Sequence, residues 1–112
     1  TPETTGIMNA GFFGMLADGA FIINGGRGPQ VDDDDLLSAL GSGKLGGAAL
    51  DVFAVEPLPQ DHPFWTHPKV RVWPHVAAQT NATSAAEQVA AAITAMMDGS
   101  EPANRVDWSR GY

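Results

Sequence analysis

Residues 20–27 read Ala-Phe-Ile-Ile-Asn-Gly-Gly-Arg, and this stretch decides the fold. Its apolar run is continuous instead of alternating, which is typical of a strand that helices cover on both faces of a parallel sheet. The two glycines that follow allow a sharp bend or a close approach to a ligand. Residues 20–24 are therefore predicted to form a buried strand, with Arg27 just beyond its carboxyl end.

Two more apolar runs, residues 47–55 and 70–73, are predicted to be strands of the same kind. Proline, which cannot donate a hydrogen bond to a sheet, ends each of them, at Pro57 and Pro74. Glu56 and His75 therefore follow the second and third strands as Arg27 follows the first. In a parallel sheet the carboxyl ends lie at one edge, where ligands collect.

Helices are predicted between and after these strands. Asn9 can cap a short helix, and the acidic run from Asp32 to Asp35 can cap a second. Several candidate caps occur between Thr80 and Ser84, with Ser84-x-x-Glu87 forming a capping box, for a third helix that ends near Met97. The element order predicts an α/β fold, the C-terminal part of a doubly wound parallel sheet with about three strands and flanking helices. We expect the apolar stripe of the third helix to exceed what three strands can cover. Its members are Val89, Ile93, Met96 and Met97.

Three features imitate ligand sites. Residues 41–46 match the pattern G-x-G-x-x-G, but they follow a helix and open a strand, whereas a dinucleotide site needs the reverse order. His62 and His67 could suggest a metal, but each precedes a proline and no third ligand is near. The acidic run could bind a cation only if further ligands converged on it, so we interpret it as a helix cap.

Phe64 and Trp65 are expected to pin the loop of residues 56–68 to the domain.

The bulk composition limits the classes of partner. The chain has 112 residues, of which 44% are hydrophobic, and a formal net charge of -7. This charge disfavours nucleic acid and anionic membrane surfaces, and no apolar run approaches the ~20 residues that span a bilayer. With no cysteine, disulfides and thiolate zinc sites are excluded, and a soluble cytoplasmic chain is expected. Because it opens on Thr-Pro-Glu-Thr without Met, we expect a fragment.

The residues at the strand ends suit carbonyl reduction. As hydride reaches the carbon, negative charge builds on oxygen, and His75 can donate the proton. Glu56 could fix the tautomer of His75, and the planar fork of Arg27 suits the carboxylate of a 2-oxo acid. Each residue also has an ordinary interpretation: a structural histidine, a solvated loop carboxylate and an exposed strand-end arginine. Asp51, costly to bury alone, should bond either backbone or a polar ligand group.

Several motifs occur in a characteristic order. They are Thr-Pro-Glu-Thr at 1–4, Ile-Asn-Gly-Gly-Arg-Gly-Pro-Gln-Val-Asp at 23–32, Gly-Lys-Leu through Glu-Pro-Leu-Pro at 43–59, and Pro-His-Val-Ala-Ala-Gln-Thr at 74–80. Together they resemble the D-isomer-specific 2-hydroxyacid dehydrogenase family, over nearly the whole chain. The motif His-Pro-Phe-Trp-x-His-Pro and the ending at 106–112 are most similar to its glyoxylate/hydroxypyruvate reductase A branch. A glutamate at position 56 speaks against the sister formate dehydrogenases, which have glutamine there.

The resemblance implies a role for each candidate residue. Arg27 would bind and polarise the 2-oxo acid, His75 would donate the proton, and Glu56 would support His75. The cofactor would be contacted by Gly25, Gly26, Arg27, Asp51, His75, Ala77 and Ala78, with no metal. A Rossmann-type fold is implied, with residues 1–82 as the end of the NAD(P)-binding domain and residues 83–112 packing on the substrate domain.

The resemblance also implies a cofactor and partners. NADPH is expected, with NADH possible, together with a small 2-oxo acid and a homodimer when full length. The nucleotide fingerprint should lie upstream, so the fragment alone is expected to be inactive. Two alternatives stay open: another family member such as a phosphoglycerate dehydrogenase, and a non-catalytic nucleotide-binding interaction module.

Overall fold

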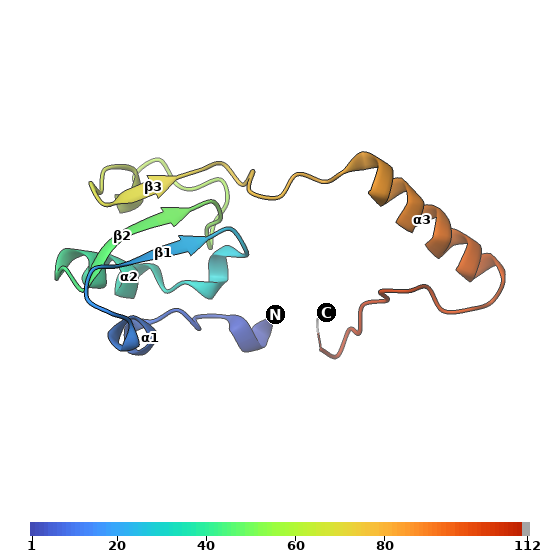
Figure 1. Ribbon diagram of the computed structural model, residues 1–112, viewed down its shortest axis with the longest axis horizontal. Helices are drawn as coiled ribbons and strands as arrows, with labels where there is room; N and C mark the ends of the chain where they lie inside the picture. Colours follow the sequence, from blue (N-terminus) through green and yellow to red (C-terminus); the bar gives the residue numbers. More distant parts are fainter. Residues whose placement is uncertain (111–112) are drawn as a thin grey trace. The chain divides into compact units, whose positions relative to one another are not determined.

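Three parallel strands form one sheet in the order β1-β2-β3 (Figure 1). This computed structural model describes residues 1–110. Its principal elements are α1 (Ala10–Met15), β1 (Ala20–Asn24), α2 (Asp33–Gly41), β2 (Leu45–Leu50), β3 (Val70–Val72) and α3 (Ala82–Met97). The chain divides into two units, one spanning Pro2–Ala78 and the other containing Thr1 and the residues from Gln79 onward. The predicted fold class, a piece of a doubly wound parallel sheet, is confirmed.

The first strand has the predicted bounds, but the second differs. β2 begins at Leu45 and ends at Leu50, instead of spanning residues 47–55. The chain leaves the sheet after Leu50 because the Phe53 N–H donates to the Glu56 side chain and not to a neighbouring strand. The third strand ends at Val72, one residue earlier than predicted. The corrected bounds place Asp51 just beyond a strand end.

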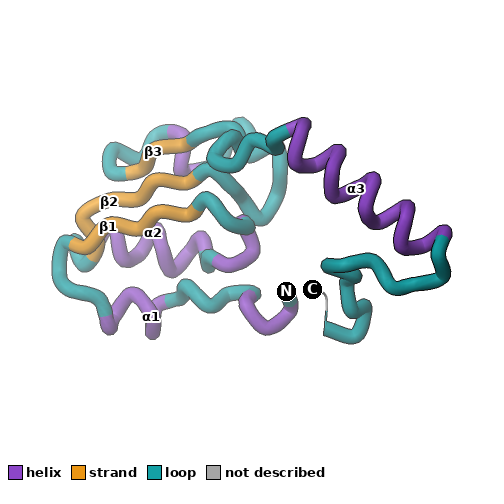
Figure 2. Tube along the Cα trace, turned by 45° about the vertical axis from the view of Figure 1, so that its right-hand side comes forward, coloured by secondary structure: helices purple, strands orange, loops and turns teal. Residues whose placement is uncertain are grey.

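Helices cover one face of the sheet. Both α1 and α2 lie on the same side of the strands, and the two views agree on this (Figures 1 and 2). The side chains packed between the layers are Phe13, Ile22, Leu36, Leu40, Leu45, Leu50 and Phe64, all at most 6% exposed. On β1, by contrast, Phe21 and Ile23 are 73% and 81% exposed. The expectation that helices cover this strand on both faces is therefore wrong within the described residues, because α1 and α2 share one face.

The helix starts were predicted with mixed success. Asn9 caps α1 by accepting from the Phe12 N–H, and Asp32 caps α2 by accepting from the Asp35 N–H, both as predicted. The cap of α3 is Asn81, which lies within the range of candidate caps predicted from Thr80 to Ser84, but the capping box at Ser84 is wrong. α3 begins two residues before it, because the Asn81 side chain accepts from the N–H groups of Thr83 and Ser84.

The second unit consists of α3 and the tail that follows it. Asp98 and Gly99 end the helix, and Gly99 has the positive φ of 73° that suits glycine. No residue of α3 is buried, and its apolar stripe is 53–82% exposed, as expected for a helix that needs further protein to cover it. Gly111 and Tyr112, the end of the predicted C-terminal motif, lie outside the described residues. Within residues 1–110 no helix combines the length and apolarity that crossing a membrane requires.

The loop between β2 and β3 is anchored by one aromatic residue. Phe64 is 1% exposed and packs in the core, as predicted. Trp65 is 52% exposed, and its indole N–H donates to the Pro59 carbonyl within the same loop. The expectation that both aromatics pin the loop to the domain is therefore wrong for Trp65, because its hydrogen bond is local.

Candidate active site at the carboxyl ends of the strands

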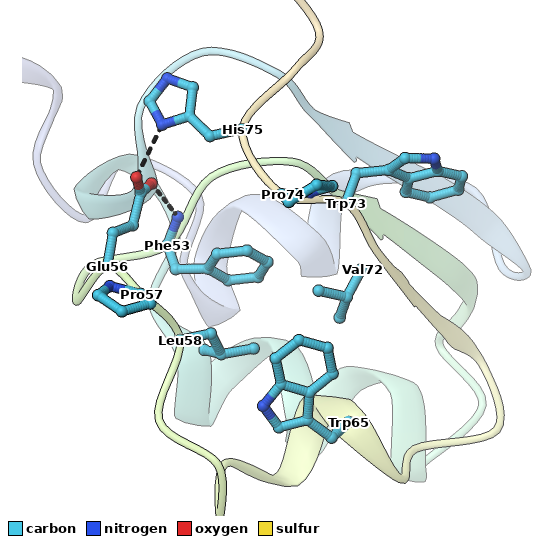
Figure 3. Close-up of a pocket in the computed structure, with 9 residues that line it drawn as sticks. All are labelled: Phe53, Glu56, Pro57, Leu58, Trp65, Val72, Trp73, Pro74 and His75. Carbon is cyan, nitrogen blue, oxygen red and sulfur yellow. Dashed lines mark hydrogen bonds and ion pairs between the residues drawn. The ribbon is translucent and has the colours of Figure 1, made fainter.

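Glu56 and His75 meet at the carboxyl ends of β2 and β3. His75 Nδ1 lies 2.7 Å from Glu56 Oε2, while Glu56 Oε1 accepts from the Phe53 N–H at 2.9 Å (Figure 3). An ionised carboxylate can only accept, so the histidine donates through Nδ1–H and its Nε2 is left for a ligand. The hydrogen bond from His75 lowers the pKa of the Glu56 carboxyl, and the Phe53 N–H lowers it further.

A special backbone conformation places the His75 ring. His75 has a φ of 57°, in the left-handed region that non-glycine residues rarely adopt. The next two residues are held by Asp51, whose carboxylate accepts from the Val76 N–H at 2.9 Å and the Ala77 N–H at 2.7 Å. These hydrogen bonds lower the pKa of the Asp51 carboxyl, and the bond from the Val76 N–H has the largest effect. Asp51 is 7% exposed. Of the two alternatives predicted for Asp51, the structure shows the backbone partners, and Asp51 stabilises the turn that carries His75.

Two glycines bring the loop of Arg27 against the other two loops. A Cβ added to Gly28 would lie 1.8 Å from the Phe53 carbonyl carbon and 2.0 Å from its oxygen. A Cβ added to Gly25 would lie 3.2 Å from the Ala77 Cβ. The loops after β1, β2 and β3 therefore touch one another, and only the absence of a side chain at Gly28 allows the closest of these contacts.

Arg27 is anchored by its backbone and exposed at its side chain. Its N–H donates to Gln30 Oε1 at 3.1 Å, and its carbonyl oxygen accepts from Asn24 Nδ2 at 3.2 Å. Its guanidinium donates from Nη1 to the Gly26 carbonyl at 2.8 Å. In the described part of the chain Arg27 makes no hydrogen bond to Glu56 or His75, so the geometry joins these three residues through their loops and not by direct contact.

Two cavities flank these loops. The larger, about 600 Å³, lies behind the Glu56–His75 pair, and Figure 3 shows its aromatic and aliphatic walls. Its lining residues are Phe53, Glu56, Pro57, Leu58, Trp65, Val72, Trp73, Pro74 and His75. The smaller, about 300 Å³, lies across the carboxyl ends of β1 and β2, and is lined by Ile23, Asn24, Gly25, Ala49, Asp51, Trp73, Val76 and Ala77. It is almost wholly apolar with one carboxylate in its wall, which is the general character of a small-molecule pocket.

Comparison with known proteins agrees with this geometry. Residues 1–77 match the model of the D-isomer specific 2-hydroxyacid dehydrogenase, NAD binding domain. The chain belongs to the D-isomer specific 2-hydroxyacid dehydrogenase family. Glyoxylate/hydroxypyruvate reductase A of Serratia proteamaculans is 53% identical over all 112 residues, and that of Yersinia enterocolitica is 50% identical. The chain spans about a third of these relatives, 36% of their length.

Solved structures of the same family are also similar. A 2-hydroxyacid dehydrogenase of Xanthobacter autotrophicus Py2, in complex with NADPH and MES, superposes with a TM-score of 0.93 at 46% identity. The match covers 100% of this chain and 46% of that one. An NADPH-dependent glyoxylate/hydroxypyruvate reductase of Sinorhizobium meliloti, in complex with NADP and sulfate, gives 0.90 at 42% identity, covering 100% of this chain and 37% of that one.

The glycine pattern at residues 41–46 has another role in this member of the family. Gly43 has a φ of 82° in the turn between α2 and β2, at the opposite end of β2 from Asp51. The prediction that these glycines form a helix end and a turn is confirmed. Within residues 1–110 no cluster of three or more histidine or acidic side chains could hold a metal ion. His62 Nδ1 accepts from the Phe64 N–H, and His67 Nδ1 from the Lys69 N–H.

Part of the wall of the smaller cavity consists of residues that the sequence predicted to contact a cofactor. Gly25, Asp51 and Ala77 are in its wall, whereas Asn24, Trp73 and Val76 were missed. Asn24 carried a usable signal, since a polar residue that ends an apolar run before Gly-Gly is typical of a turn built by its own side chain. Its Oδ1 indeed accepts from the Gly26 N–H at 3.0 Å. Trp73 and Val76 carried no comparable signal, because apolar residues are expected near a strand end.

Proposed function

We propose that this chain supplies the proton donor and the carboxylate anchor of an NADPH-dependent 2-oxo acid reductase that acts on glyoxylate or hydroxypyruvate. The observation that carries the proposal is the Glu56–His75 pair at 2.7 Å, at the carboxyl ends of parallel strands. The names of the Serratia and Yersinia relatives support the substrate class, and the NADPH in the Xanthobacter structure supports the cofactor.

In this proposal each residue has one task. The nicotinamide supplies a hydride to the carbonyl carbon when it is bound. His75 gives its Nε2 proton to the carbonyl oxygen as the electrons of the C=O π bond move onto that oxygen. Glu56 accepts from Nδ1–H throughout, which fixes the ring and stabilises the imidazolium. Arg27 binds the carboxylate of the 2-oxo acid with its planar fork and polarises the neighbouring carbonyl.

The smaller cavity fits the nicotinamide end of the cofactor. Its volume of about 300 Å³ suits a ring and not a whole dinucleotide, and its apolar walls suit a ring face. The proposed cofactor contacts are Gly25, Gly26, Arg27, Asp51, His75, Ala77 and Ala78, joined now by Asn24, Trp73 and Val76. Gly25 and Ala77 support this proposal because their small size leaves the cavity open between two loops.

The assembly around this site is also proposed. We propose that residues 83–112 pack on the substrate domain of a longer cytoplasmic protein, which forms a homodimer, and that residues 1–82 complete its NAD(P)-binding domain. The exposed stripe of α3, with Met97 at 82%, supports a covering partner for this helix. Sedimentation of the longer protein would test the homodimer.

A chimaera tests the activity. This chain would replace the matching segment of the Serratia relative, and NADPH oxidation would be followed with glyoxylate, hydroxypyruvate and phosphohydroxypyruvate. The control chimaera carries the Yersinia segment at the same junction. We expect both to reduce glyoxylate and hydroxypyruvate. A folded but inactive chimaera beside an active control would refute the proposal, and a preference for the phosphorylated substrate would favour a phosphoglycerate dehydrogenase.

A substitution in the chimaera tests the proton donor. His75→Ala should lower turnover by roughly 10²- to 10⁴-fold, the usual contribution of general acid catalysis, while NADPH affinity stays nearly unchanged. His67→Ala is the matched control, because His67 bonds only the backbone of its own loop. Intact turnover in His75→Ala would remove this residue from the acid role.

A further inference from the structure

Gln30 lies beside the proposed carboxylate anchor and has no role in the reaction as described so far. It ends the short 3-10 turn Gly28–Gln30 directly after Arg27. Its side-chain Oε1 accepts from the Arg27 N–H at 3.1 Å, and its own N–H donates to the Arg27 carbonyl at 3.2 Å. Gln30 thus binds both backbone polar groups of Arg27.

The position of Gln30 is itself determined by neighbouring segments. Its carbonyl accepts from the Met8 N–H at 2.9 Å, and the Pro29 carbonyl accepts from the Gly6 N–H at 2.8 Å. Gly26 leaves room for the side chain, since a Cβ there would lie 2.8 Å from Gln30 Oε1. Neighbouring segments therefore hold Gln30 in place, and Gln30 in turn holds the backbone of Arg27.

The anchored backbone of Arg27 matters because the side chain of this residue is exposed. The Arg27 guanidinium is exposed, and among the described residues its hydrogen-bond partner is the Gly26 carbonyl of the same turn. An arginine binds a carboxylate in two-pronged fashion only when its fork arrives in the right plane. A loop that is ordered before binding lowers the cost of ordering it on binding.

We propose that Gln30 is a positioning residue for Arg27, whose side-chain oxygen orders the turn so that the guanidinium faces the carboxylate of the 2-oxo acid. This inference rests on the proposed function. Gln30 touches neither the substrate nor the reacting atoms, and it acts through the backbone of Arg27. Its removal therefore weakens the hold of the Arg27 fork on the oxo acid and leaves the contact between Glu56 and His75 as it was.

Substitutions in the chimaera test this role. Gln30→Met keeps the length of the side chain and removes its oxygen, whereas Gln30→Glu keeps an oxygen that can accept from the Arg27 N–H. We expect Gln30→Met to raise the KM for glyoxylate roughly tenfold, within the hundredfold that a misplacement of ~1 Å can cause. The Kd for NADPH should change less than the KM for glyoxylate, and Gln30→Glu should recover most of the lost affinity.

A double substitution separates a positioning role from a merely structural one. If Gln30 acts through the arginine fork, Gln30→Met should have little further effect in an Arg27→Lys background, because lysine cannot form the two-pronged contact. An unchanged KM in Gln30→Met, or its full effect in the Arg27→Lys background, would overturn the inference. So would a rise in the Kd for NADPH as large as the rise in the KM for glyoxylate. If Arg27→Lys itself leaves the KM for glyoxylate unchanged, Arg27 does not bind the carboxylate of the substrate. That result would contradict the proposed function, and it can be distinguished from a failure of the inference about Gln30.

Discussion

Gly28→Ala is the most informative single change at this site. The added Cβ would lie 1.8 Å from the Phe53 carbonyl carbon, 2.0 Å from its oxygen and 2.5 Å from the Ala54 nitrogen. Carbon atoms in contact ordinarily lie ~3.5 Å apart or more, so the loops after β1 and β2 must separate by about 1.7 Å. All three atoms belong to the backbone, so no side-chain rotation relieves the clash.

Two quantities should change in Gly28→Ala. Overpacking against a rigid neighbour typically costs about 1–3 kcal/mol of unfolding free energy, which urea titration of the chain followed by circular dichroism would measure. In the chimaera, kcat/KM for glyoxylate should fall by roughly 10²-fold, because a shift of ~1 Å in a positioning element has that effect. The loss arises because Arg27 moves with Gly28, while Glu56 and His75 stay with the other loops.

Gly14→Ala is the matched control. Gly14 lies within α1, and nothing lies within 4 Å of a Cβ built there. Alanine at this position should stabilise the helix by roughly 0.5–1 kcal/mol and leave kcat/KM unchanged. The reasoning is refuted if Gly28→Ala has the stability and the kcat/KM of the unsubstituted protein, since the loops would then not be in the contact on which the site depends.

Three further substitutions test other parts of the structure. The pKa of Glu56 is lowered from its ordinary value of 4.5, so its ionised form stabilises the fold above pH 4.5. This contribution is lost as the pH falls through the pKa of the folded state. Below pH 4.5, urea midpoints should therefore fall less steeply with pH in Glu56→Gln than in the unsubstituted protein. Phe64→Ala removes a ring that is 1% exposed and should cost about 3–5 kcal/mol in urea titration, whereas the same change at the half-exposed Trp65 should cost clearly less, and equal costs would contradict the assigned anchor. Asn81→Ala should destabilise α3 by ~1 kcal/mol and lower helicity by circular dichroism, while Ser84→Ala has little effect, and the reverse order would restore the capping box.

The three strands illustrate what local sequence can predict. The continuous apolar run of β1 predicted its bounds correctly, because strand propensity acts along the whole run, although Phe21 and Ile23 are exposed. The end of β2 was missed by five residues. The Asp51 N–H still donates to the Asn24 carbonyl of β1, but the Phe53 N–H donates to Glu56 instead of a neighbouring strand. The Phe53 N–H has a side-chain partner because Glu56 folds back toward it, and hydrophobic periodicity does not predict such a contact.

The candidate site, like the strands, could be predicted from the sequence only in part. The order of the motifs around Arg27, Glu56 and His75 was enough to predict the family, the sheet and the likeness to a reductase, because residue types at strand ends are a local property of the chain. The 2.7 Å contact between Glu56 and His75, the clamp of Asp51 on the His75 turn and the hold of Gln30 on Arg27 were decided only by the tertiary structure. Glu56 and Asp51 meet residues 19 and 25 positions away, and such contacts exist only once parallel pairing has brought the strand ends to one edge. Even Gln30, three residues from Arg27, is held by the Met8 N–H and fits against Gly26, and side-chain orientation is a property of the packed molecule.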